Sequence, residues 1–214
     1  MTLIVKWLSQ SCFWLRTTDL SVYFDPGFLN TSEPLQRADM ILVSHHHFDH
    51  LLKGSVSLLA DDWTSKVGPM KCRRKLGKNA QVVKPGDHID VKGTEVQVVD
   101  AYNPKQRYKL TYHKKGACVG YVIMIDGRWV YHAGDTGLID EMSDLGPVDL
   151  ALLPIGGKVT MGVDEAVEAV KRIRPMMVVP MHMKKADPME FKNKVEKIGE
   201  TQVSVLGPNE MFSF

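Results

Sequence analysis

The sequence predicts an α/β (α+β) fold in which two β-sheets pack against each other and helices cover the outside. Three observations support this. The first forty-odd residues contain a series of short strand-like segments, the second half of the chain repeats that plan, and two well-marked helices follow late in the second half. Two sheets packed together, with helices outside them, satisfy this order of elements.

Strand-like segments recur along both halves of the chain. Four early ones, rich in β-branched or aromatic residues and bounded by turn formers, read TLIVKWLS, CFWLRTT, SVYFDPG and ADMILVS. A helix is expected in LLKGSVSLLA, and three further strands, separated by PGD and KG turns, are expected over residues 80–103. In the second half a hairpin turns at Asp126 and Gly127, and VDLALLPIGG and MMVVPMH are continuous apolar runs typical of buried strands.

Two helices in the second half carry clear start and stop signals. The first begins near Val163, has apolar residues at helical spacing and ends before Pro175. The second has Asp187 as its N-cap and Pro188 at its first helical position. Its predicted buried stripe consists of Phe191, Val195 and Ile198.

Composition indicates one soluble domain. A chain of 214 residues with 44% hydrophobic residues can bury a sizeable core, and no linker divides it, so a single domain is expected over 1–214. The net charge of +2 gives no whole-chain argument for nucleic acid or membrane. No run approaches the roughly 18 apolar residues of a membrane helix. The three cysteines are odd in number, far apart and outside any C-x-x-C motif, so neither disulfides nor a thiolate metal site is indicated, and a cytoplasmic location is expected.

The segment SHHHFDHL, residues 44–51, holds four of the eight histidines. In an extended segment alternate side chains point to the same side, so His45, His47 and Asp49 can face one point. His50 can then reach a second point nearby, whereas His46 faces the other way and is expected to be an ordinary histidine. Neutral imidazoles with a carboxylate suit Zn²⁺ or another first-row divalent ion.

Other candidate ligands follow apolar strands, as the histidine cluster does. Asp135 ends the segment VYHAGD and His182 ends VVPMH, while Asp100 and Asn103 follow the strand VQVV. In an α/β arrangement with strand ends along one edge, these side chains can converge. The sequence therefore predicts a metal site at that edge.

These motifs resemble those of the metallo-β-lactamase-fold hydrolases. The resemblance is carried by H-x-H-x-D-H at residues 45–50, by G-D-T at 134–136 and by the late His182. The segments DPG, YHAGDT and LLPIGG are similar to those of the branch of metal-dependent hydrolases related to ascorbate-6-phosphate lactonase. The resemblance implies an αββα sandwich of two mixed sheets flanked by helices, with pseudo-symmetric halves at about 1–103 and 116–214.

The resemblance also implies a ligand set and a reaction. His45 and His47 would bind the first metal ion, Asp49, His50 and His182 the second, and Asp135 both. Two divalent ions per chain are expected, with Zn²⁺ first and Mn or Fe as alternatives. A hydroxide bridging them would attack an ester, lactone, amide or phosphoester of a small substrate, and Asp49 would act as the catalytic residue that orients the hydroxide or receives its proton.

One position departs from the family pattern. A further histidine usually completes the first metal's ligands, and here Asn103 stands in that place. An amide oxygen is a weaker ligand than an imidazole. Either the first site is weaker, or His113, ten residues further on, completes it; we favour His113.

The substrate and the alternatives stay open at this level. The basic segment NPKQRYKLTYHKKG, residues 103–116, indicates either an anionic substrate or a solvated loop. The alternatives to a hydrolase are a mononuclear iron dioxygenase, a nuclease or phosphodiesterase, and a non-catalytic metal-binding module. A small-molecule partner is expected and no membrane, and nucleic acid ranks below a small molecule as the substrate. Homo-oligomer formation is left open, and the loop DPGFLN, residues 25–30, is a candidate interface or lid.

Overall fold

The computed structural model describes the chain apart from residues 1, 30, 32–33 and 105–111. Its strands form two seven-stranded sheets. The strands of the first sheet are β1 (Ile4–Ser9), β2 (Cys12–Arg16), β3 (Ser21–Phe24), β4 (Met40–Leu42), β5 (Ser65–Pro69), β6 (Gln81–Val83) and β14 (Met211–Ser213). Those of the second are β7 (His88–Val91), β8 (Thr94–Asp100), β9 (Val119–Ile125), β10 (Arg128–His132), β11 (Leu150–Pro154), β12 (Met177–Met181) and β13 (Gln202–Val203).

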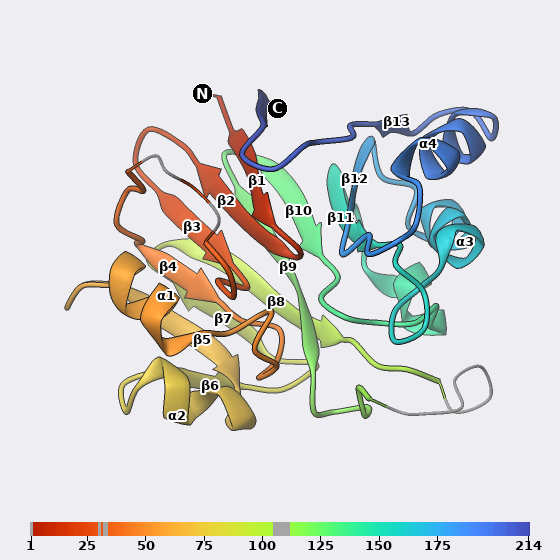
Figure 1. Cartoon of the computed structure of the whole chain (residues 1–214). Coiled ribbons are helices and arrows are strands. Elements are labelled where there is room, and N and C mark those ends of the chain that lie inside the picture. The colour runs from red at the N-terminus through yellow and green to blue at the C-terminus, as the bar shows by residue number, and fades with distance from the viewer. Residues whose placement is uncertain (1, 30, 32–33, 105–111) are drawn as a thin grey trace.

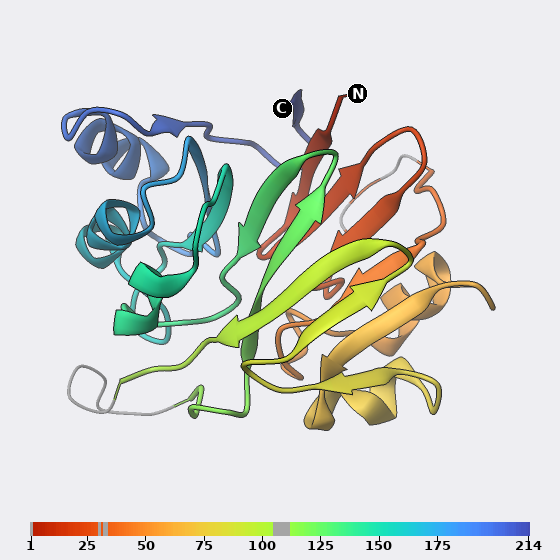
Figure 2. The same cartoon turned by 180° about the vertical axis from the view of Figure 1, so that it is seen from behind.

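Helices lie outside both sheets (Figure 1). They are α1 (Lys53–Leu59), α2 (Arg73–Leu76), α3 (Val163–Ile173) and α4 (Pro188–Glu196), with short 3-10 turns η1 (Met70–Cys72) and η2 (Asp140–Asp144). α1 and α2 belong to the side of the first sheet, whereas α3 and α4 lie beside β11 to β13 of the second, as the view from behind in Figure 2 also shows. Within the described residues, none of the helices has the length and apolarity needed to cross a bilayer.

Alternation along the strands of the first sheet builds two cores. Phe13 and Leu15 of β2 belong to the main core, which also contains buried residues of the second sheet. Their neighbour Trp14 instead packs in a smaller core with Val56 of α1 and Leu76 of α2. Because successive side chains of a strand point to opposite faces, one strand serves both layers. The predicted sandwich of two packed mixed sheets flanked by helices is confirmed.

Strand direction determines where the candidate ligands gather. The order is β14-β1-β2-β3-β4-β5-β6 in the first sheet and β13-β12-β11-β10-β9-β8-β7 in the second. β3 and β4 are parallel, as are β10, β11 and β12. β8 has the same direction as β10 because both are antiparallel to β9. The candidate residues that follow β4, β8, β10 and β12 therefore emerge at carboxyl ends of strands, the position expected for a ligand site in such sheets.

The second of the two predicted helices ends earlier than its apolar pattern indicated. The Asp187 carboxylate accepts a hydrogen bond from the Met189 N–H at 2.8 Å, as an N-cap should. Phe191 and Val195 are fully buried, but Ile198 is 46% exposed, so its predicted burial is wrong. α4 ends at Glu196, and Ile198 follows in a turn that directs it away from the buried face.

Candidate metal centre

The histidine cluster begins three residues after β4 and closes in a turn. The N–H groups of His50 and Leu51 both donate to the carbonyl of His47, at 3.1 and 2.9 Å. The expectation of an extended segment is therefore wrong for residues 47–50. The turn separates Asp49 from His45 and His47 and places it in a group with His50.

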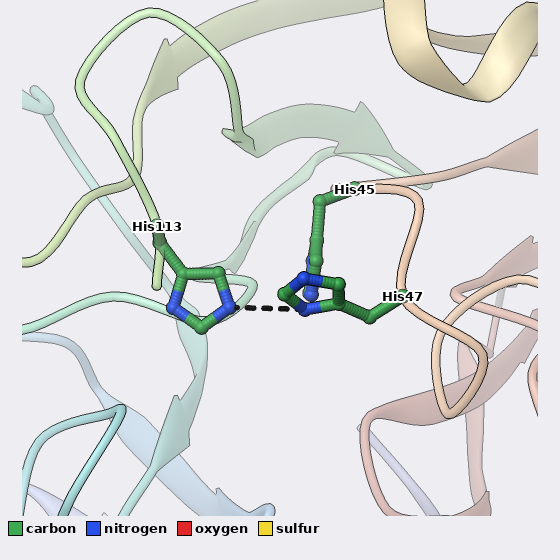
Figure 3. A group of neighbouring side chains, drawn as sticks. All are labelled: His45, His47 and His113. Atoms are coloured by element: carbon green, nitrogen blue, oxygen red, sulfur yellow. Dashed lines mark hydrogen bonds between the residues drawn. The ribbon is translucent and has the colours of Figure 1, made fainter. Parts of the chain in front are cut away.

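His45, His47 and His113 form the first group of candidate ligands. One ring nitrogen from each lies within 4.8 Å of the others. Figure 3 shows the three rings converging from two separate loops, with His113 Nε2 at 3.3 Å from His47 Nδ1. His45 and His113 are buried, whereas His47 is partly exposed.

Asn103 contacts His113 directly. Its side-chain oxygen accepts a hydrogen bond from the His113 backbone N–H at 3.1 Å and lies 3.0 Å from His113 Nδ1. Its amide nitrogen donates to the carbonyl of Val159 at 2.9 Å, and that carbonyl is also 3.1 Å from His113 Nδ1. These acceptors favour the tautomer with hydrogen on Nδ1, which leaves Nε2 as the ligand atom. The geometry supports His113 as the third member of the first group, with Asn103 holding it in place.

Replacing Asn103 with alanine should weaken the first metal position. His113 would lose an acceptor for its backbone N–H and ring, and loss of a group that orients a metal-bound histidine typically lowers metal affinity 10- to 100-fold. Zn²⁺ titration against a competing chelator measures this, with Asn103→Asp, which keeps an acceptor oxygen, as the matched comparison. Unchanged affinity in Asn103→Ala would contradict the orienting role.

Asp49, His50 and His182 form the second group. His182 Nε2 lies 3.6 Å and His50 Nε2 4.0 Å from Asp49 Oδ2. His182 directly follows β12, and its backbone N–H donates to the carbonyl of Gln10 at 3.0 Å. Its left-handed backbone, with φ of 47°, directs the chain away after the strand. His50 and His182 are fully buried, but the Asp49 side chain is 19% exposed.

Asp135 lies between the two groups. Its Oδ1 is 3.3 Å from His50 Nε2, and its Oδ2 is 3.5 Å from His182 Nε2 and 3.6 Å from His113 Nε2. His132 supports this turn because its Nδ1 accepts a hydrogen bond from the Gly134 N–H at 3.2 Å. One carboxylate thus faces histidines of both groups, the position required of a ligand shared by two metals.

Asp25 is a site residue that sequence reasoning missed. It is fully buried directly after β3, and it accepts hydrogen bonds from the Ser44 N–H and hydroxyl, both at 2.6 Å. Its Oδ2 lies 2.7 Å from His50 Nδ1, and the Ser44 hydroxyl is 2.9 Å from His45 Nδ1. Asp25 and Ser44 therefore hold one histidine of each group by the nitrogen that faces away from Asp135. The sequence does contain a signal for Asp25, because this residue directly follows a predicted strand, as the predicted ligands do.

Burial governs the protonation of the first group. It holds the pKa values of His45 and His47 below the ordinary value, and lowers the pKa of His113 to about 4. Burial also opposes the charged form of His50, but the carboxylates of Asp135 and Asp25 outweigh it and raise the His50 pKa. The first group is therefore uncharged at neutral pH, the state in which imidazole binds metal.

The residues fit divalent metal ions. Within the described part of the chain, the buried Nε2 atoms of His45, His50 and His182 and the buried Oδ1 of Asp135 have no hydrogen-bond partner. Leaving a buried polar atom unsatisfied typically costs about 1–3 kcal/mol each, and several of them converge here. Imidazole nitrogens with carboxylate oxygens are the donor set expected for Zn²⁺ and similar ions. Binding of such ions would give these buried atoms the partners that they lack.

The remaining sequence expectations concern His46 and the basic segment 103–116. His46 is in neither group, and its carbonyl, like that of Leu51, accepts a hydrogen bond from Lys75 of α2 at 2.9 Å. Much of the basic segment 103–116, including Lys105, Arg107 and Lys109, lies outside the described residues.

Comparison with known proteins leads to the same family that the sequence motifs resemble. A family model described as a β-lactamase superfamily domain matches residues 4–182. A "UPF0173 metal-dependent hydrolase" of Staphylothermus marinus is 35% identical over 235 residues, covering 99% of both chains. The crystal structure of a Parabacteroides distasonis protein matches with a TM-score of 0.86 and 28% identity, over 95% of this chain and 92% of that one. Igni18, a metallo hydrolase from Ignicoccus hospitalis, matches with a TM-score of 0.81 and 29% identity, over 100% and 99% of the two chains.

Proposed function

Because the chain is a metal-dependent hydrolase of the metallo-β-lactamase superfamily, we propose that it uses two divalent metal ions to hydrolyse a small substrate. The observation that carries the proposal is Asp135, whose carboxylate faces His113 of the first group and both His50 and His182 of the second. His45, His47 and His113 would hold one ion, Asp49, His50 and His182 the other, and Asp135 both. Zn²⁺ is the proposed ion.

The protein's own groups have distinct roles in this scheme. Bound divalent ions would supply Lewis acidity and lower the pKa of water toward neutrality. Asp25, Ser44 and Asn103 orient the histidines, and burial keeps the first group neutral. Asp49 is a partly exposed carboxylate, and in this scheme it would orient an attacking water and accept its proton.

The substrate is proposed to carry an ester, lactone, amide or phosphoester bond next to an anionic group. Burial is the main cause of the lowered pKa values of His46 and His47, and the positive charge of Lys71 contributes to both. Lys71 is exposed on η1, so its charge acts at the partly exposed His47 side of the centre. A carboxylate or phosphate of a substrate would pair with such a cation.

Metal analysis on untagged protein, purified without chelators or added metal, tests this function. Two Zn²⁺ or Mn²⁺ ions per chain are expected, with hydrolysis of at least one member of a panel of lactones, esters and phosphodiesters. His47→Ala should lower both metal content and hydrolysis, whereas His88→Ala, an exposed histidine on β7, should change neither. One iron per chain with oxygen-dependent turnover would contradict the proposal.

A further inference from the structure

Two exposed phenylalanines meet beside the second ligand group. Phe28 is 43% and Phe48 63% exposed, although both are large apolar side chains. Their ring centroids lie 5.8 Å apart with an interplanar angle of 74°, an edge-to-face contact. Phe48 stands in the turn between His47 and Asp49, the two partly exposed members of the ligand groups.

The backbone that carries Phe28 is packed directly on the metal centre. A Cβ atom at Gly27 would lie 2.0 Å from the carbonyl oxygen of Asp49 and 2.8 Å from the backbone nitrogen of His50, so the two segments touch backbone to backbone. The Ser55 hydroxyl donates to the Gly27 carbonyl at 2.6 Å, and the Ser9 hydroxyl donates to the Phe28 carbonyl. These contacts hold the backbone of Gly27 and Phe28 against the turn that carries Phe48 and Asp49.

We propose that Phe28 and Phe48 form an apolar wall that binds an aromatic or branched alkyl group of the substrate next to the second metal position. The inference rests on the proposed function and adds a substrate class to it: a molecule with a hydrolysable polar group and a compact apolar group close to it. The remaining ligands are buried, so a substrate reaches the centre past His47 and Asp49, where Phe48 stands. An apolar group placed there would cover ring surface that is now in water, which stabilises the complex.

A binding experiment on the Zn²⁺-loaded protein tests the wall without requiring turnover. Methylphosphonate and benzylphosphonate present the same anionic head to the metals, and only the second carries a phenyl ring. Calorimetric titration should show benzylphosphonate binding about tenfold tighter, the preference expected when a phenyl ring is removed from water against two others. Phe28→Ser with Phe48→Ser should abolish this preference while leaving methylphosphonate affinity within about twofold. If the double variant is unstable, Phe48→Ser alone, which changes the more exposed ring, should reduce the preference for benzylphosphonate over methylphosphonate.

Trp63→Ser is the matched control. Trp63 is 81% exposed and precedes the amino end of β5, which runs parallel to β4, so it lies at the sheet edge opposite the ligands. It should keep the full preference for benzylphosphonate. Equal affinity for the two phosphonates in the parent protein would contradict the proposed apolar wall. A preference for benzylphosphonate that persists without both phenylalanines would contradict it as well.

The outcomes also separate this inference from the function on which it rests. If neither phosphonate binds the Zn²⁺-loaded protein, the metal centre itself is contradicted, and the wall with it. If the phenyl preference follows Phe28 and Phe48 but no ester, lactone or phosphoester is hydrolysed, the wall stands and the proposed hydrolysis fails.

Discussion

Asp135→Ala is expected to remove metal from both groups and to lower hydrolysis by about 10³-fold or more, because one substitution removes the carboxylate that faces both ligand groups and is proposed to bind both ions. Asp135 is 2% exposed, and its carboxylate lies near His113 of the first group and near His50 and His182 of the second. Plasma mass spectrometry gives the metal content, and circular dichroism checks that the variant is folded.

A matched control separates this effect from a general loss of negative charge. Asp62 is an exposed aspartate between α1 and β5, away from the ligand groups, so Asp62→Ala should retain metal and activity. A folded Asp135→Ala protein with its full metal content would show that the shared ligand has been assigned wrongly.

Gly27→Ala is expected to destabilise the fold and to disturb the second metal position together. The new methyl group would meet the backbone of Asp49 at 2.0 Å and that of His50 at 2.8 Å, and neither can move aside as a flexible side chain would. Overpacking of this kind costs about 1–3 kcal/mol or more. Urea unfolding of the metal-free protein measures the loss of stability, and zinc content after dialysis measures the effect on Asp49 and His50.

Gly54→Ala is the comparison for this substitution. Gly54 lies in α1, and a Cβ atom added there has nothing within 4 Å. Because alanine favours a helix over glycine by about 1 kcal/mol, this variant should be as stable as the parent or more so, with unchanged zinc content. A Gly27→Ala protein of parental stability and zinc content would contradict the close packing of the two loops.

Most of the fold was predictable because its elements are marked locally. Composition, periodicity and turn residues over a few positions predict strand segments such as ADMILVS and the helix that starts near Val163. Both elements occur where they were expected. Ile198 shows the limit of this reasoning: its spacing fits the buried stripe, but α4 stops before it, and the stop depends on how the chain turns toward β13.

Much of the candidate site was also visible in the sequence. His45, His47, Asp49, His50, Asp135 and His182 were all nominated, the last two by their position after strands. The fold brings all six together. The parallel strands β10 and β12 place Asp135 and His182 at one edge of the second sheet, and these residues meet the turn that follows β4 of the first sheet. Their role as metal ligands stays a prediction that the metal analyses above will test.

The sequence by itself thus determined most of the strands and helices, apart from β5, β13 and β14, and nominated the strand-end residues. Tertiary structure alone decided that His113 reaches the first group while Asn103 stands behind it, because the carbonyl of Val159 helps to hold both. It also decided that Asp25 binds His50 and that Phe28 meets Phe48. The hydrogen bonds among these contacts join residues 10 to 66 positions apart. No local sequence pattern predicts them, because the distance in space between such residues depends on how the sheets and loops pack.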